Sequence, residues 1–66
     1  MNINEIFGNN VRNKRISLKL SQEKLANMAE IDRTYLPDIE KGKRNISLIV
    51  AEKIANALGV CLKDLL

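Results

Sequence analysis

Residues 22–41 have the sequence QEKLANMAEIDRTYLPDIEK, which is the most informative segment for predicting the fold. Its apolar residues recur at intervals of three and four, which predicts helices rather than strands. A small residue, Ala26, stands where two short helices would cross closely, and Ile31 lies in the turn between them. The side chains of Leu36 and Ile39 would pack the second helix against the core. The segment is therefore expected to form two short helices joined by a tight turn.

Capping signals set the ends of these two helices. Ser21 is a good N-cap, so the first helix is expected at about 22–29. Asp32 is the next candidate and would open a second helix over 33–41. Gly42 would end that helix, because glycine readily adopts the left-handed conformation found at helix ends. Such a pair is typical of a helix-turn-helix, which holds its second helix out from the surface.

Helical spacing continues on both sides of this pair. One helix is expected at about 4–17, another at 48–58 between an N-cap at Ser47 and a stop at Gly59, and a final helical turn at 62–66. The sequence therefore predicts an all-α fold, a compact unit of five short helices. The expected core residues are Ile3, Phe7, Val11, Leu18, Leu25, Ala26, Met28, Ala29, Leu36, Ile39, Leu48, Ala51, Ile54, Ala55 and Leu58.

Length and composition restrict the kind of protein. A chain of 66 residues is expected to be one domain, 1–66, that buries only about 60% of its surface on folding. Because it opens with methionine and carries no tag, we expect an intact short protein. It shows no signal peptide and no apolar run of membrane length, and its single cysteine, Cys61, indicates a reducing compartment, so we expect the cytoplasm. Without histidine, a His-based metal site or general base is excluded, and we predict no enzyme, cofactor or metal.

The distribution of charge is more informative than its total. Net charge is only +3, but the basic residues form two groups, one before and one after the predicted helix pair. The groups are Arg12, Lys14, Arg15 and Lys19, and Lys41, Lys43 and Arg44. In isolation, two solvated faces would be the simpler interpretation. Beside a helix-turn-helix, the two groups favour double-stranded DNA as the partner.

The segment SQEKLANMAEIDRTYLPDIEKGKRNISL, followed by AEKIANALGVCLKDLL, resembles the phage-repressor-like (lambda repressor/Xre) helix-turn-helix family. The resemblance extends from Phe7 to Leu66. Within the family, residues 32–36 and 39–45 are most similar to restriction–modification controller proteins, small dimeric regulators that time endonuclease expression relative to the protecting methyltransferase. The resemblance implies a lambda-repressor-like domain and a transcriptional regulator that binds a pseudo-palindromic operator, with no small-molecule effector evident.

The docking geometry of this fold assigns most DNA contacts to the second helix of the pair and its flanks. The expected base contacts are Arg33, Thr34 and Asp38. Arg33 is the best of them, since its guanidinium can bond guanine through two N–H groups, while Asp38 can accept from cytosine or pair with Arg33. The expected phosphate contacts are Gln22, Tyr35, Lys41, Lys43, Arg44 and Asn45. For Gln22 this role is carried over from the resemblance, and Tyr35 has a partly buried structural role as its alternative.

Two residues depart from the family pattern. Glu30 stands in the turn where many members have glycine, and a left-handed conformation there would cost on the order of 1 kcal/mol. Pro37 lies inside the second helix of the pair, where it removes a backbone donor and can bend or delay the helix. The resemblance also pairs Arg15 with Glu40, a structural ion pair that would join the first helix to the end of the third.

Apolar residues outside the core stripe predict a homodimer. Ile49 and Val50 lie outside the row of apolar residues by which the fourth helix is expected to face the core. The chain also ends with more apolar surface than one helical turn can bury. The expected interface is Ile49, Val50, Val60, Leu62, Leu65 and Leu66. A contiguous apolar patch often marks an interface, and a two-fold contact would place both DNA-binding helices on one side. Scattered exposed apolar residues are the alternative.

Two other functions are compatible with the same fold. One is an antitoxin-like repressor, whose main partner would be a toxin protein. Such antitoxins usually carry an extra toxin-binding segment, and this chain ends at Leu66 without one. The other is the N-terminal DNA-targeting domain of a larger enzyme such as a DNA methyltransferase.

Overall fold

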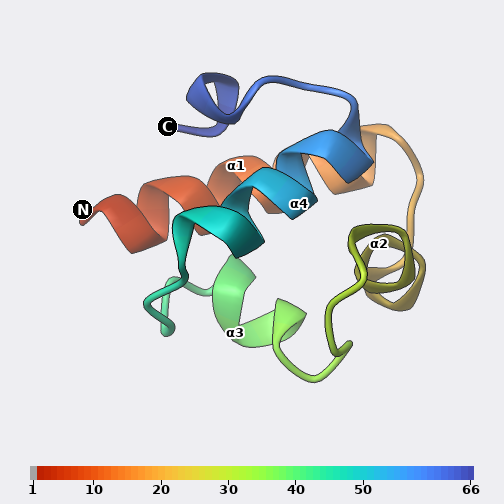
Figure 1. Cartoon of the computed structure of the whole chain (residues 1–66), viewed down its shortest axis with the longest axis horizontal. Helices are drawn as coiled ribbons and strands as arrows, with labels where there is room; N and C mark the ends of the chain where they lie inside the picture. Colours follow the sequence, from red (N-terminus) through yellow and green to blue (C-terminus); the bar gives the residue numbers. More distant parts are fainter. Residues whose placement is uncertain (1) are drawn as a thin grey trace.

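The computed structural model describes residues 2–66. This part of the chain contains four α-helices and one short 3₁₀ helix, joined by loops (Figure 1). No strand occurs among these residues. The elements are α1 (Ile3–Ser17), α2 (Gln22–Ala29), α3 (Leu36–Glu40), α4 (Leu48–Leu58) and the 3₁₀ helix η1 (Leu62–Leu65). The all-α class is confirmed, but the expectation of five helices is wrong, because the last element is a single 3₁₀ turn.

Side-chain caps explain where three of the helices begin. The Ser21 hydroxyl accepts from the Lys24 backbone N–H at 3.0 Å, and the Ser47 hydroxyl accepts from the Val50 N–H at 3.1 Å. Both serines were the predicted caps of α2 and α4. Helix α1 begins at Ile3, one residue earlier than predicted, because Asn2 and Glu5 form a reciprocal capping box.

Helix α3 is shorter than the sequence suggested. It starts at Leu36 rather than Arg33, and residues 33–35 form a turn instead. Pro37 lies in the first turn of α3, where a missing N–H costs nothing because that N–H has no partner within the helix. Asp32 therefore caps the preceding turn: its Oδ1 accepts from the Thr34 N–H at 2.9 Å and from the Thr34 hydroxyl at 2.8 Å.

A residue with positive φ follows each of the four α-helices. Glu30 ends α2 with φ 58° and ψ 41°, so the turn adopts the conformation for which many family members use glycine. The Ile31 N–H then donates to the Ala26 carbonyl at 3.0 Å, which closes the turn. Gly59 ends α4 in the same conformation, as predicted. Lys19, between α1 and α2, also has a positive φ of 59°, which was not predicted.

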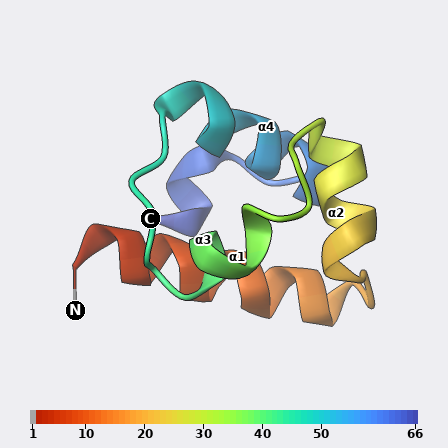
Figure 2. The same ribbon diagram turned by 90° about the horizontal axis from the view of Figure 1, so that it is seen from below.

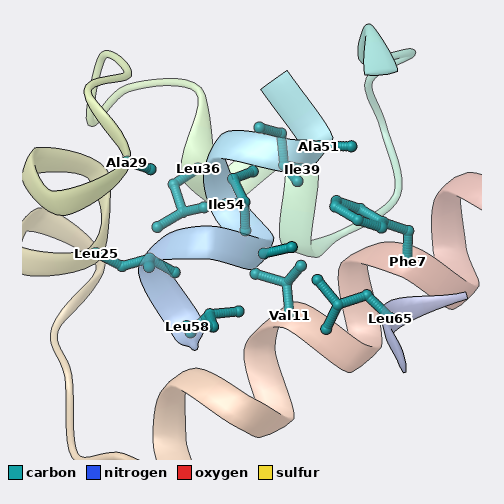
Figure 3. Packing of buried hydrophobic residues seen from close by; sticks show 11 residues of the cluster. Phe7, Val11, Leu25, Ala29, Leu36, Ile39, Ala51, Ile54, Leu58 and Leu65 are labelled. Atoms are coloured by element: carbon teal, nitrogen blue, oxygen red, sulfur yellow. The ribbon is translucent and has the colours of Figure 1, made fainter. Parts of the chain in front are cut away.

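The core lies where the four α-helices meet, with α2 packed on α4 and α1 on α3 (Figure 3). Its members are Phe7, Val11, Leu25, Ala29, Leu36, Ile39, Ala51, Ile54, Ala55, Leu58 and Leu65. In Figure 1, α3 lies below α1 and α4, with α2 beside it. The two helices of the predicted pair therefore occupy the same side of the molecule.

Four predicted core residues are exposed: Ile3, Leu18, Met28 and Leu48. Leu48 is 78% exposed although it continues the stripe of α4, because it is the first residue of that helix and projects past the edge of the core. Ile3 likewise lies at the first residue of α1, and Leu18 follows its last. The helical period predicts the face of the helix on which a side chain lies. It does not predict whether other helices reach far enough along that face to cover the side chain.

The C-terminal end of the chain folds back on α1. The Asn10 amide donates to the Leu65 carbonyl at 3.0 Å, and the Leu65 side chain is only 2% exposed. Both ends of the chain lie on the same side of the molecule in two perpendicular views (Figure 1, Figure 2). Leu65 was predicted to lie at a dimer interface. That prediction is wrong, because η1 buries Leu65 within its own chain.

Candidate nucleic-acid interface

Helix α3 is held close to α1 by a glycine that the sequence analysis did not single out. Gly8 of α1 is buried, and a Cβ atom at this position would lie 2.9 Å from the Glu40 carbonyl oxygen and still closer to that of Ile39. The end of α3 thus rests directly on the backbone of α1. Glycine in the middle of a predicted helix was the only available signal, since such a residue costs helix stability and needs a packing reason.

A buried ion pair fixes the same end of α3. Arg15 Nε lies 2.7 Å from Glu40 Oε2, and Arg15 Nη2 lies 3.1 Å from Glu40 Oε1. The remaining donor group of Arg15, Nη1, donates to the Leu20 carbonyl at 2.8 Å, and the Gln22 amide donates to Glu40 Oε1 at 3.1 Å. One network therefore connects α1, the start of α2 and the end of α3. Among the described residues, Glu40 is the one buried charged side chain.

Arg33 lies in the turn before α3 and is bound to an acid of α2. Its Nη1 is 2.6 Å from Glu23 Oε2, and both side chains are exposed. The predicted alternative partner of Arg33 was Asp38, and that expectation is wrong because the turn at 33–35 aims Arg33 toward the start of α2. The neighbouring Thr34 is exposed, with its hydroxyl bonded to Asp32.

The carboxyl group of Asp32 is more acidic than an ordinary aspartate. Two hydrogen bonds lower the pKa of this carboxyl below its ordinary value of 3.8, first that from the Thr34 backbone N–H and then that from the Thr34 hydroxyl. Both bonds favour the charged form of the carboxylate. The turn that presents Arg33 and Thr34 is thus held by an ionised side chain.

Tyr35, Asp38 and Arg44 form a second exposed cluster. The guanidinium carbon of Arg44 lies 4.4 Å from the centre of the Tyr35 ring, which is the geometry of a cation–π contact. Arg44 Nε is 3.8 Å from Asp38 Oδ2, an ion pair without a hydrogen bond. Tyr35 is exposed, so the alternative of a partly buried structural tyrosine is wrong.

The loop after α3 carries the remaining predicted contacts. Lys41, Lys43 and Asn45 are exposed in this loop, which runs along the side of the molecule where the chain begins (Figure 2). Asn45 is anchored there, since its Oδ1 accepts from the Asn4 amide at 2.6 Å. Gly42 has φ 74°, and a Cβ on it would lie 2.7 Å from Glu5 Cα, so the loop needs glycine for both conformation and space.

The expected dimer residues differ in how exposed they are. Ile49 and Leu66 are exposed, whereas Val50, Val60 and Leu62 are half-buried against the core. Several exposed apolar side chains lie around a groove of about 200 Å³ at the starts of α1 and α4 and the chain end, which the half-buried Leu62 also lines. Ile3, Leu48 and Leu66 line this groove, and Ile49 follows Leu48 in the chain.

Three further features of residues 2–66 concern membranes, metals and thiol chemistry. No helix in this range is long and apolar enough to cross a membrane. The same residues contain no group of three His, Cys, Asp or Glu side chains that could hold a metal ion. Cys61 is an exposed free thiol.

Known proteins with similar sequences include control proteins. Residues 11–65 match the family model described as helix-turn-helix. The chain is 54% identical over 66 residues to control protein C.BamHI of Bacillus amyloliquefaciens, an alignment that covers 98% of this chain and 82% of the relative. It is 45% identical over 60 residues to control protein C.MunI of a Mycoplasma species, with 89% and 81% covered.

Solved structures agree with the sequence comparison. The restriction-modification controller protein C.AhdI from Aeromonas hydrophila superposes with a TM-score of 0.92 at 38% identity, and 96% of each chain is covered. The hypothetical transcription factor NHTF from Neisseria gives a TM-score of 0.94 at 38% identity, with 98% of this chain and 75% of that one covered. The chain therefore belongs to the helix-turn-helix family, together with these control proteins.

Proposed function

We propose that this protein is a dimeric, sequence-specific DNA-binding regulator of transcription, and that it acts as the controller of a restriction–modification system. The observation that carries the proposal is the exposed surface formed by the turn at 33–35 and the basic loop at 41–45. It combines a guanidinium that can bond a base with neighbouring cations that can bind phosphates. The relatives named as control proteins support the controller role.

In this proposal, the turn at 33–35 enters the major groove ahead of α3. Arg33 bonds guanine, and Thr34 offers its methyl group to thymine while its hydroxyl stays on Asp32. Asp38 contributes less than the other two, because it lies beside Arg44. The late start of α3 moves the base contacts from a helix onto a capped turn, which is held in place by Asp32.

The phosphate contacts flank this turn. Lys41, Lys43 and Asn45 follow α3 in the loop, and Arg44 is supported by the Tyr35 ring. Gln22 at the start of α2 gives one amide N–H to Glu40. An amide carries two such groups, so the second remains available for a phosphate oxygen. The Arg15–Glu40 pair supports this arrangement structurally.

Dimerisation is proposed through the apolar groove. A contact across a two-fold axis at Ile3, Leu48, Ile49 and Leu66 would bury the exposed apolar surface of one chain against another. Two copies related in this way bind a pseudo-palindromic site with half-sites about one helical turn, or roughly 34 Å, apart. The dimer also supplies burial that a domain of this size has little of by itself.

The test is selection of a binding site followed by one substitution. The wild-type protein should enrich a pseudo-palindromic sequence from a pool of random duplexes. Arg33→Ala should then weaken binding to the selected duplex by about 1–3 kcal/mol and relax specificity at one base pair of each half-site. Equal weakening of selected and random duplexes would contradict the role of Arg33 in base recognition. Failure to enrich any sequence would contradict the proposed function.

A further inference from the structure

The arginine proposed to contact a base is already bound to a carboxylate of its own chain. Arg33 Nη1 lies 2.6 Å from Glu23 Oε2, with 68% and 60% of the two side chains exposed. The pair joins the turn before α3 to the first turn of α2, so Glu23 lies within the proposed DNA-binding surface. Resting on the proposed function, we propose that Glu23 is a specificity-determining residue: it reduces the attraction of Arg33 to phosphates and leaves Arg33 able to bond guanine.

Glu23 changes the net charge of the surface around Arg33. Binding to random DNA depends on cations that displace counterions from the phosphates. Glu23 cancels the charge of Arg33 at close range, and its own carboxylate repels phosphates that approach the start of α2. The pair therefore adds almost nothing to the attraction for random DNA, although it lies in the interface.

Arg33 has more hydrogen-bond donors than Glu23 occupies. A guanidinium has five N–H groups, and Glu23 is bonded to Nη1 only. Guanine takes two of these groups through its O6 and N7 acceptors. Arg33 can therefore bond guanine without leaving Glu23, and the existing bond limits the orientations that Arg33 would otherwise lose on binding.

The neighbouring arginine shows that this arrangement is particular to Arg33. Arg44 also faces an acid, Asp38, but at 3.8 Å and without a hydrogen bond. The Arg44 guanidinium also lies over the Tyr35 ring, and its charge is less closely compensated than that of Arg33. Arg44 is thus suited to phosphates, whereas Arg33 is neutralised until a base with two acceptors is present.

The test uses Glu23→Gln, which removes the charge and keeps the shape of the side chain. Binding of the whole chain is measured to a duplex selected by the wild-type protein and to a random duplex of equal length, over a series of salt concentrations. We expect the variant to bind the random duplex about tenfold more tightly, with a salt dependence steeper by about 0.9 for each chain of the bound dimer, the slope expected for one added charge per chain. Affinity for the selected duplex should rise much less, so that the specificity ratio falls.

Two further variants isolate the cause. Glu52→Gln changes net charge equally at an exposed position of α4 and should leave the specificity ratio unchanged. In an Arg33→Ala background, Glu23→Gln should no longer change the ratio, because the pair is already absent. Circular dichroism checks that each variant is folded.

The inference is overturned if Glu23→Gln leaves the ratio at its wild-type value, or if Glu52→Gln lowers it equally. It is also overturned if Glu23→Gln weakens binding to the selected duplex and leaves the random duplex unaffected, since Glu23 would then only hold Arg33 in place. These outcomes presuppose that the wild-type protein discriminates between the two duplexes. A wild-type protein without such discrimination contradicts the proposed function itself.

Discussion

Arg15 and Glu40 connect α1 to the end of α3 through two parallel hydrogen bonds of 2.7 and 3.1 Å. Both side chains are nearly buried, with 13% and 3% of their surface exposed. Every charged oxygen and nitrogen of the pair has a partner, because Leu20 and Gln22 occupy the remaining positions. The segment that carries the proposed DNA contacts is thus fixed to the first helix by a network in which each of these charged atoms has a partner.

Removing one member of this pair should strongly destabilise the fold. Arg15→Ala or Glu40→Ala leaves an unpaired charge in a dry environment, a loss of about 3–5 kcal/mol. The exposed pair offers a matched control, since Arg33→Ala should cost at most about 1 kcal/mol. Urea unfolding followed by circular dichroism measures both. Values within about 0.5 kcal/mol of wild type for Arg15→Ala would show that the network contributes no more than ordinary surface contacts.

Gly8→Ala should also destabilise the protein, although alanine favours helices. The added methyl group would overlap the backbone oxygens of Ile39 and Glu40, and backbone cannot move aside as a side chain can. Overpacking of this kind costs typically about 1–3 kcal/mol, against the roughly 1 kcal/mol gained in helix propensity. Asn9→Ala, at an exposed neighbouring position of α1, is the control and should be neutral or stabilising. A higher melting temperature for Gly8→Ala would refute the close approach.

The Asp32 cap should depend on pH. Because hydrogen bonds from Thr34 lower the pKa of the folded carboxyl below 3.8, its contribution to stability is present above pH 3.8 and is lost as pH falls through the lower folded value. Asp32→Ala should therefore be less stable than wild type near neutral pH, and the difference should shrink in strong acid. Urea midpoints of the two proteins across this range measure it. A difference independent of pH would exclude the ionised cap.

Lys43 should contribute to DNA affinity without contributing to specificity. Its side chain is exposed in the loop after α3, and in the proposal it binds a phosphate. Lys43→Ala should weaken selected and random duplexes by the same factor and reduce the salt slope by about one unit for each chain of the dimer. Lys63→Ala removes the same charge from η1 and should change neither. A loss confined to the selected duplex would assign Lys43 to a base instead.

Local signals predicted most of the helix boundaries, because a cap involves only neighbouring residues. Ser21, Ser47 and Gly59 each act within one turn, and α2 and α4 have the predicted bounds. Pro37 was correctly identified as a residue that could delay α3, but its position alone did not say by how much. The turn at 33–35 depends on the Asp32 side chain bonding to Thr34, a competition with the helix that propensity does not resolve.

Features that depend on packing between distant segments were not predictable. Leu65 is buried because η1 folds back on α1, and Leu48 is exposed because α4 starts beyond the core. Both residues are leucine, so only the tertiary arrangement determines that one is buried and the other exposed. The Arg33–Glu23 pair was missed for the same reason, since the left-handed turn at Glu30 brings the two residues together.

The exposed apolar groove leads to the last prediction. Leu48 and Ile49 are 78% and 71% exposed, and Ile3 and Leu66 lie beside Leu48 around the groove. In the proposed dimer, Ile49→Glu would place a charge in each half of the contact without disturbing the core of either chain. We therefore expect a folded monomer with much weaker operator binding, because one half-site then binds without its neighbour.

Ile16→Glu is the matched control. Ile16 is also exposed and apolar, but it lies at the opposite end of α1 from Ile3. This variant should remain a dimer with wild-type affinity for the operator. Leu65→Glu cannot serve as a second test, since Leu65 is a core residue and its replacement would unfold the chain. Sedimentation equilibrium decides the matter: if Ile49→Glu and Ile16→Glu have the same molecular mass at micromolar concentration, the two chains do not meet at this groove.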